Sequence, residues 1–492
     1  MAKKKYNKLL FILALCSLGL LCGGCQKKDA AEYVQTTEEE NTMADENFLS
    51  LGPGAGGIGS EEPKEEGKHT AISEPEYTAV KLTQAASGDA VAAAALDDQF
   101  LSGTTAFSLN LLKQCMEKPA DNGNYMISPA SAQMALAIAA NGADGQTKRE
   151  LEQVLWGRMP LEAGQAADTE EKQDIDMLSR YLNTYVEQLT GSEQVHFQNA
   201  NALWVYDNSH VSSGMENLIT VREDYLKKVA AFHAEVYQAP FDDTTVTDIN
   251  GWVNYNTNGM IPSILEFIPN GAVMYIINAI TFEGKWVDQF SPEQMEPDFA
   301  FTAADQSVQT VEGMRDNLHG YLEDAHATGF LKYYDGGKYA FAAILPEKGM
   351  SPEDYISHLS AEQFIQLFQN ADKMQPVRVT MPKFSSEYQV ELREALEALG
   401  MKEAFLDTAD FSLMADTATG VLKIDQVLQK TFIEVDENGT RAAAATALDM
   451  DMLTAIREDE PKEVILDRPF IYAVMDMENN LPIFLGVLNS VE

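Results

Sequence analysis

An alternating run near the carboxyl end is the part of the chain best suited to take part in chemistry. Read in steps of two from Thr440 to Met452, one set of residues is small or apolar and the other is mostly alanine and charged. Such alternation is typical of a strand with one buried face. It stops at Leu453, an apolar residue followed by Thr454. A protease could recognise the chain at this point.

Local composition leaves two structures open for this run. Its thirteen residues would make a strand of about 43 Å, far longer than the usual five or six residues. The letters RAAAATAL also favour an exposed helix or loop, because alanine is the best helix former. Small side chains permit both structures at different times, since they lose little entropy on ordering. Gly439 supplies a hinge before the run, and the segment is predicted to switch conformation.

The sequence holds none of the common catalytic signatures. There is no G-x-S-x-G, no H-E-x-x-H and no P-loop, and the seven histidines are scattered. No pair of carboxylates is singled out by its spacing, which disfavours a glycosidase. Trp286 and Phe290 are more typical of a core than of a ligand site. We therefore expect no enzyme activity, no metal and no cofactor.

Composition indicates a large soluble protein that avoids nucleic acid. The 492 residues are 45% hydrophobic and 23% charged, enough to bury a sizeable core. The net charge of -41 would repel phosphate backbones.

The first 25 residues are predicted to be an export signal. Four lysines precede an apolar stretch from Leu9 to Leu21 that is too short to span a membrane comfortably. The letters LLCGGC resemble the lipobox of bacterial lipoproteins, which makes Cys25 the expected site of lipidation, although Cys22 stands where leucine is preferred. An ordinary signal peptide, an uncleaved anchor, and a redox or metal-binding C-x-x-C are the alternatives. We expect an exported protein, lipid-anchored at the bacterial cell surface and facing outward.

Residues 26 to 97 form a polar segment rich in glutamate and glycine. This composition predicts a disordered tether with a mean reach of about 40 to 50 Å. Of the four cysteines, only Cys115 would remain unlipidated after cleavage of the leader, so no internal disulfide is expected. Cys115 lies in an amphipathic helical stretch and is predicted to be a core residue.

Residues 98 to 492 are predicted to form one α+β domain, because helical and strand periods alternate without a linker or repeat. The spacing of apolar residues predicts helices at 101–117, 130–140, 147–155 and 173–189. Apolar runs predict strands at ANALWV, VMYIINAITF, YAFAAILP and VRVTMPKF.

The letters EVDENGTRAAAAT (434–446) resemble the hinge of the reactive-centre loop of inhibitory serpins. The resemblance continues through NYMISPASAQMALAIAANGADGQTKRELEQVL, ANALWVYDN, INGWVNYNTNGMI, NAITFEGKWVDQF, VTMPKFSSEYQVELREALEALGMKEAF, ADFS and RPFIYAVMDMENNLPIFLGVLN. It implies about nine helices around three β-sheets, a large central sheet and an exposed reactive-centre loop at about 437–460.

The resemblance also implies a function, namely suicide inhibition of a serine protease. Cleavage is expected between Leu453 and Thr454, suiting a chymotrypsin-, elastase- or subtilisin-like enzyme, with Met452 and Arg457 as alternative sites. A non-inhibitory serpin acting as a surface binding or chaperone module is the main alternative function, and a lipoprotein hydrolase is a third. The helix at 173–189 is acidic where some serpins carry a basic heparin-binding helix, so no such activation is expected. The protein is expected to be a monomer.

Several site residues are assigned by the same resemblance. Glu437 is expected to pair with Lys383 at the top of the sheet, with two uncoupled exposed charges as the alternative. Gln429 stands where most members have histidine, and its amide can still form hydrogen bonds. The hinge comprises Glu437, Gly439, Thr440, Ala442, Ala443, Ala444, Ala445 and Thr446. The region where the sheet opens comprises Ser128, Ser131, Asn278, Trp286, Lys383 and Gln429.

Overall fold

A computed structural model describes most of the chain after residue 71. The described residues are 72–83, 94–120, 123–158, 175–190, 195–207, 219–231, 234–418, 420–440 and 460–491. They fall in one compact unit, residues 66 to 492. The expectations for the leader, for Cys25 and for residues 441–459 of the reactive-centre loop lie outside the described residues.

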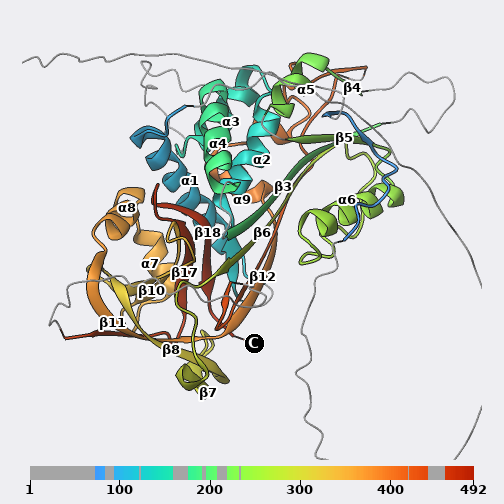
Figure 1. The fold of residues 1–492 in the computed structure, drawn as a ribbon. Coiled ribbons are helices and arrows are strands. Elements are labelled where there is room, and N and C mark those ends of the chain that lie inside the picture. Colours follow the sequence, from blue (N-terminus) through green and yellow to red (C-terminus); the bar gives the residue numbers. More distant parts are fainter. Residues whose placement is uncertain are drawn as a thin grey trace, which may run out of the picture. The chain divides into compact units, whose positions relative to one another are not determined.

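A seven-stranded sheet runs through the middle of this unit (Figure 1). Its strands, in spatial order, are β1 (Val80–Lys81), β5 (Glu235–Ala239), β3 (Val195–Tyr206), β6 (Met274–Lys285), β15 (Gly439–Thr440), β14 (Gln426–Val435) and β12 (Phe384–Glu391). Both of its faces are covered. Ala202 and Trp204 of β3 pack with Trp252 in one core cluster, whereas Leu203 and Val205 belong to the other. Burial on both faces explains the continuous apolar runs in β3 and β6.

The other two sheets complete the β structure of the described residues. A nine-stranded sheet consists of β16 (Lys462–Ile465), β11 (Asp372–Pro382), β8 (Val308–Glu323), β9 (Ala327–Tyr333), β10 (Tyr339–Pro346), β17 (Phe470–Asp476), β18 (Leu481–Leu488) and β2 (Tyr125–Ile127), with β7 (Met295–Thr302) paired to β8. A two-stranded sheet consists of β13 (Ala415–Thr417) and β4 (Ile219–Val221).

Nine α-helices are present among the described residues, in agreement with the expected α+β class. They are α1 (Asp98–Met116), α2 (Pro129–Ala140), α3 (Gly145–Leu155), α4 (Ile175–Thr190), α5 (Glu223–Ala230), α6 (Asp243–Asn256), α7 (Pro352–His358), α8 (Ala361–Gln369) and α9 (Arg393–Leu399), besides the short 3-10 helices η2 (Pro292–Gln294) and η3 (Glu403–Phe405). The first four agree with the helices predicted from periodicity. In Figure 1, α6 lies on one side of β3 and β6, and α2, α3 and α4 lie on the other. No described helix is long and apolar enough to cross a membrane.

All twelve residues of α2 are buried, and the helix begins with a proline at its first turn. Proline suits this position because its missing N–H would have no partner there. The helix contacts both β3 and β6, so it covers one face of the seven-stranded sheet at its middle. Cys115 of α1 is buried with a free thiol, whose pKa burial raises to about 12, as expected for a core cysteine.

The predicted tether extends too far toward the carboxyl end. Residues 72–83 lie inside its range, yet β1 pairs antiparallel with β5. The backbone N–H of Ala79 also donates to the carboxylate of Asp248 at 2.7 Å, and Tyr77 packs edge-on against Tyr237. This part of the range is therefore structured, because backbone pairing and aromatic packing outweigh its polar composition.

Candidate functional site

The middle of the seven-stranded sheet has two parts. Along one part, strands β6 and β14 are hydrogen-bonded neighbours, and along the other part strand β15 lies between them. Strands β6 and β14 pair in parallel from Tyr275 to Thr281 and from Gln426 to Phe432. Beyond this stretch β15 lies between them, antiparallel to both. A strand that continued from β15 would run between β6 and β14, and we call the place where β15 lies the entry.

The entry is narrow because two glycine backbones meet there. Gly439 pairs with Lys285, and the next residue, Thr440, pairs with Gly284. A methyl group on Gly439 would lie 2.1 Å from the carbonyl oxygen of Gly284. Such an approach requires glycine, so the glycine expected to act as a hinge is needed for close contact between backbones.

A tight turn leads into β15. The Asp436 carboxylate accepts from the backbone N–H groups of Asn438 at 2.7 Å and Gly439 at 3.0 Å. The carbonyl oxygens of Glu437 and Asn438 accept from the backbone N–H groups of Phe290 and Trp286 at 2.9 and 3.0 Å. The backbone groups of this turn are thus paired with the Asp436 side chain and with the segment from Trp286 to Phe290. This pairing fixes the direction in which Thr440 enters the sheet.

Thr440 is fully buried, and its hydroxyl lies 2.5 Å from the phenol oxygen of Tyr334. Tyr334 is buried as well, and burial raises its pKa, so it stays protonated. Its ring stacks on Trp286 with centroids 4.6 Å apart. The indole Nε1 of Trp286 donates to the Asp436 carbonyl at 2.9 Å. Trp286 therefore joins the turn to the residue that receives Thr440.

The expected ion pair between Glu437 and Lys383 is present, with Nζ and Oε2 2.7 Å apart. Partial burial opposes both charges, but the pairing outweighs it, so the pKa of Lys383 is raised and that of Glu437 is lowered. Lys383 also lies 3.5 Å from Glu312 on β8. The lysine thus connects the hinge to the nine-stranded sheet.

A second lysine beside the entry was not predicted. Lys332 on β9 is almost fully buried and pairs with Asp316 at 2.8 Å. Its ammonium lies 4.1 Å from the ring centroid of Phe290 and donates to the Asp288 carbonyl. Burial lowers the pKa of Lys332, opposed by the nearby Asp316. These contacts hold in place the loop that binds the hinge carbonyls.

Four of the six residues expected to open the sheet, Ser128, Ser131, Asn278 and Gln429, form a continuous chain of hydrogen bonds across its middle, whereas Trp286 and Lys383 contact the hinge. Gln429 donates to Asn278 Oδ1 and to the Ser128 carbonyl at 3.0 Å, and accepts from the Ser128 N–H at 3.1 Å. Asn278 in turn donates to Ser131 and Asn201. Gln429 is completely buried. Its amide forms hydrogen bonds at the position where most serpins carry histidine, as expected.

The other expected site residues are not placed. Ala442, Ala443, Ala444, Ala445, Thr446 and the candidate cleavage residues Met452, Leu453, Thr454 and Arg457 lie outside the described residues. Among the residues that the structure describes, no group of three or more His, Cys, Asp or Glu could hold a metal ion. The described site holds the two-residue strand β15.

Tyr334 is the principal functional residue that sequence reasoning missed. It lies in LKYYDGG beside Tyr333, and no periodicity distinguishes the tyrosine that faces the hinge from its half-buried neighbour. Its bridge to Trp286 joins segments 48 residues apart in the sequence and is visible in the structure alone, so the sequence carried no signal for Tyr334.

Comparisons with known proteins agree with this geometry. Residues 102–491 match the family model described as Serpin (serine protease inhibitor). An uncharacterized serpin-like protein of Thermococcus kodakarensis is 31% identical over 391 residues, covering 78% of this chain and 84% of its own length. The native state of tengpin, a thermophilic serpin, superposes with a TM-score of 0.73 at 37% identity, covering 84% of this chain and 99% of tengpin. Its latent state gives 0.67 at 35% identity, covering 82% and 100%. The chain belongs to the serpin family and has the serpin fold.

Proposed function

We propose that this serpin is a suicide inhibitor of a serine protease of the chymotrypsin, elastase or subtilisin type. The protease serine attacks the carbonyl carbon of Leu453, the amide bond to Thr454 breaks, and Thr454 leaves as a free amine. The resulting ester joins Leu453 to the protease. Insertion of the cut segment between β6 and β14 then competes with hydrolysis of that ester.

The observation that carries this proposal is the register at the entry. Thr440 lies level with Val435 of β14 and Gly284 of β6. Further along, Gln429 lies level with Asn278, which is six residues back along both strands. The offset between β6 and β14 is therefore the same above and below the point where β15 ends. A strand continuing from Thr440 would meet matched partners on both sides without a bulge.

If the run inserted in this register, each later residue would have a definite partner on both sides. Thr446 would come level with Gln429 and Asn278, and Met450 would come level with the start of β6 at Met274. Leu453 would then lie just past the end of the strand. An attached protease would be carried to the far edge of the sheet. Cleavage after Arg457 would instead leave four more residues between the inserted strand and the protease.

Insertion is expected to be favourable because it satisfies backbone groups and buries apolar ones. Every second residue after Thr440 would face the same buried side of the sheet as Thr440, and these residues include Leu448 and Met450. Each is worth about 1.5 to 3 kcal/mol on full burial. The transported protease would lose the preorganised donors of its oxyanion hole, so hydrolysis of the ester would stall. The higher TM-score to native than to latent tengpin supports a starting state that has not yet inserted its loop.

The expected location completes the proposal. A lipid on Cys25 and a polar tether would hold the inhibitor at the bacterial surface, where it would meet exogenous proteases as a monomer. The acidic sequence of α4 argues against activation by heparin-like polyanions, which a basic helix would be needed to bind.

The test is incubation with chymotrypsin and with elastase, followed by denaturing electrophoresis. An SDS-stable adduct and a released carboxyl-terminal fragment beginning at Thr454 are expected. A protease whose catalytic serine is replaced by alanine should give neither product. Cleavage without an adduct, and without a rise in melting temperature, would instead favour a non-inhibitory serpin acting as a surface binding or chaperone module. Hydrolysis of an added ester substrate in the absence of any protease would indicate a hydrolase.

A further inference from the structure

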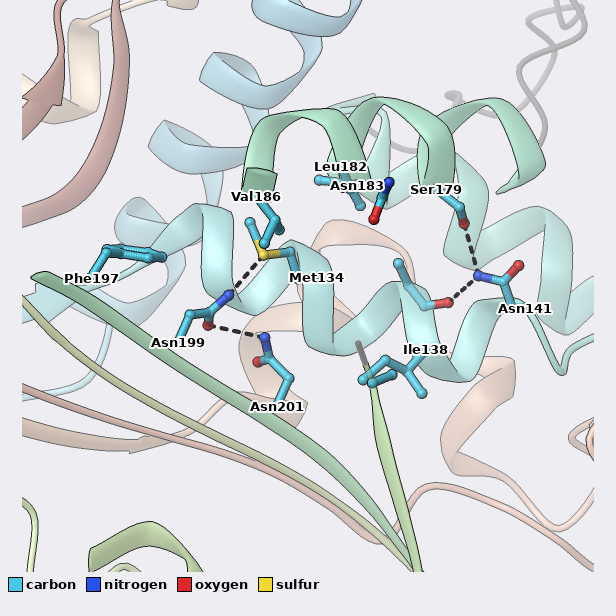
Figure 2. A pocket seen from close by; sticks show the side chains of 12 residues that line it. Met134, Ile138, Asn141, Ser179, Leu182, Asn183, Val186, Phe197, Asn199 and Asn201 are labelled. Atoms are coloured by element: carbon cyan, nitrogen blue, oxygen red, sulfur yellow. Dashed lines mark hydrogen bonds between the residues drawn. The ribbon is translucent and has the colours of Figure 1, made fainter. Parts of the chain in front are cut away.

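A cavity of about 330 Å³ lies between α2, α4 and β3 (Figure 2). Apolar side chains from all three elements line it, including Met134 and Ile138 of α2, Leu182 of α4 and Phe197 of β3. A cavity of about 150 Å³ can bind benzene, so this one has room for a single substituted ring. The apolar lining therefore suits the body of a small organic molecule.

Two buried side-chain oxygens of this lining lack a hydrogen-bond partner, Asn183 Oδ1 and Asn141 Oδ1, and Figure 2 shows that of Asn141 turned away from the other lining side chains. Asn183 of α4 is 5% exposed, and its Oδ1 accepts no hydrogen bond in the structure. Figure 2 shows the side chain extending below α4 with its oxygen turned toward the cavity. Its Nδ2 donates to Glu187 at 3.3 Å, so the orientation of the amide is set and the oxygen is left over. A buried acceptor without a donor costs about 1 to 3 kcal/mol, which a ligand donor would recover.

Apart from Asn141 Oδ1, the other amide groups of the lining have partners. Asn141 donates both amide protons, to the Ala137 carbonyl and the Ser179 hydroxyl. Asn199 and Asn201 are joined by a hydrogen bond of 3.0 Å, and Asn199 also donates to the Met134 sulfur. Asn183 Oδ1 is thus the atom best placed to select a ligand, and it selects a donor. A carboxylate would be rejected by this oxygen and by the net charge of -41.

We infer that this cavity is a binding site for a small neutral molecule with an apolar, ring-sized body and one hydroxyl or N–H donor directed at Asn183. Binding itself is independent of protease inhibition, since it requires neither the reactive-centre loop nor a target enzyme.

The cavity also has a direct connection to the residues that close the sheet. Asn199 accepts from Ser131, and Asn201 accepts from Asn278. Both asparagines line the cavity and lie on β3, which pairs with β6. A ligand between α2 and β3 would hold these asparagines in their present positions. Occupancy should therefore slow the parting of β6 from β14, a consequence that rests on the proposed function.

The binding test compares 4-ethylphenol with 4-ethylanisole, its methyl ether, which has a similar shape but no donor. Calorimetry and thermal melting of the purified protein should show binding of the phenol at least ten-fold tighter than of the ether. Asn183→Leu, which removes the acceptor at similar volume, should bring the phenol to the affinity of the ether. Asn183→Asp serves as a second variant that keeps an acceptor, and it should favour 4-ethylbenzylamine over the phenol.

A cavity-filling variant locates the site. Ala137→Leu places three more carbon atoms in the lining and should abolish binding of both probes. Equal binding of phenol and ether to the unaltered protein would overturn the proposal, as would an unchanged preference in Asn183→Leu. Failure of both probes to bind at millimolar concentration would also overturn it, and would indicate that water fills the cavity.

The connection to the sheet is tested separately with protease. Saturating 4-ethylphenol should raise the fraction of inhibitor that is cleaved without forming an adduct. If binding is found but this fraction does not change, the connection is wrong while the site stands. If no adduct forms even without phenol, the proposed function fails and the binding result is unaffected.

Discussion

The hydroxyl of Thr440 and the phenol of Tyr334 meet at 2.5 Å inside the protein, where both side chains are fully buried. Thr440 belongs to β15, and Tyr334 follows strand β9 of the nine-stranded sheet. The first residue of the strand that is proposed to insert is thus already bound to the body of the molecule.

Tyr334→Phe tests this contact by leaving the Thr440 hydroxyl buried without a partner. We expect the free energy of unfolding to fall by about 1 to 3 kcal/mol, measured by urea denaturation. Tyr185→Phe is the matched control, because the buried Tyr185 hydroxyl has no hydrogen-bond partner in the structure and its removal should cost nothing. Equal losses in the two variants would contradict a specific role for the Thr440 contact.

Thr440→Arg should convert the inhibitor into an ordinary substrate. An arginine at this fully buried position would place a charge beside Tyr334, and the cost of burying it should keep the segment out of the sheet. Denaturing gels with chymotrypsin should show cleavage without a stable adduct. Thr440→Ser keeps the hydroxyl and should preserve the adduct, whereas an adduct formed by the arginine variant would refute the proposed entry.

Glu437→Gln should lower stability slightly, by less than about 1 kcal/mol, because both partners in this ion pair are about one-third exposed. The lowered pKa of Glu437 fixes the sign of the pH dependence. Its contribution is present above the unfolded pKa of about 4.3 and is lost as the pH falls through the folded value. Melting temperatures of parent and variant should therefore converge in acid.

The control for this prediction is Glu463→Gln. Glu463 lies 3.9 Å from Arg378, and both side chains are more than half exposed. Its removal should change the melting temperature little between neutral and acid pH. A larger effect there than at Glu437 would show that the hinge pair has no special coupling.

Gln429→Ala should destabilise the sheet where it is closed. The change leaves Asn278 and both backbone groups of Ser128 without their present partner, at a cost of about 1 to 3 kcal/mol per unpaired group. Gln429→His should retain most of the stability, because an imidazole can also donate and accept. Urea denaturation distinguishes the two, and equal midpoints would indicate that the amide network contributes nothing.

Helices and strands with a clear pattern of apolar residues were predictable from the sequence, and so were residues inside a specific motif. The strand YAFAAILP agrees with β10 in both bounds, because a strand buried on both faces carries an uninterrupted apolar run. Glu437 and Lys383 were paired by the resemblance to the serpin family, which covers both the hinge and VTMPKF. The pairing of β1 with β5 was not predictable, since two residues in a polar stretch carry no period.

Contacts between distant segments were beyond sequence reasoning for a physical reason. The cavity under α4 exists because α2, α4 and β3 leave space between them, and no one of these segments encodes that space. The unpartnered oxygen of Asn183 is likewise a property of its surroundings, since asparagine on a helix usually reaches solvent.

Strand β1 also determines how the molecule would bear mechanical load. Any pull transmitted from the chain before residue 72 reaches the packing of Tyr77 on Tyr237 first, then the link from Ala79 to Asp248, and then this two-residue strand. Strands β5 and β3 separate it from β6. If the chain is anchored as proposed, tension would detach β1 before it could separate β6 from β14, so a pull on the anchor should leave the middle of the sheet closed.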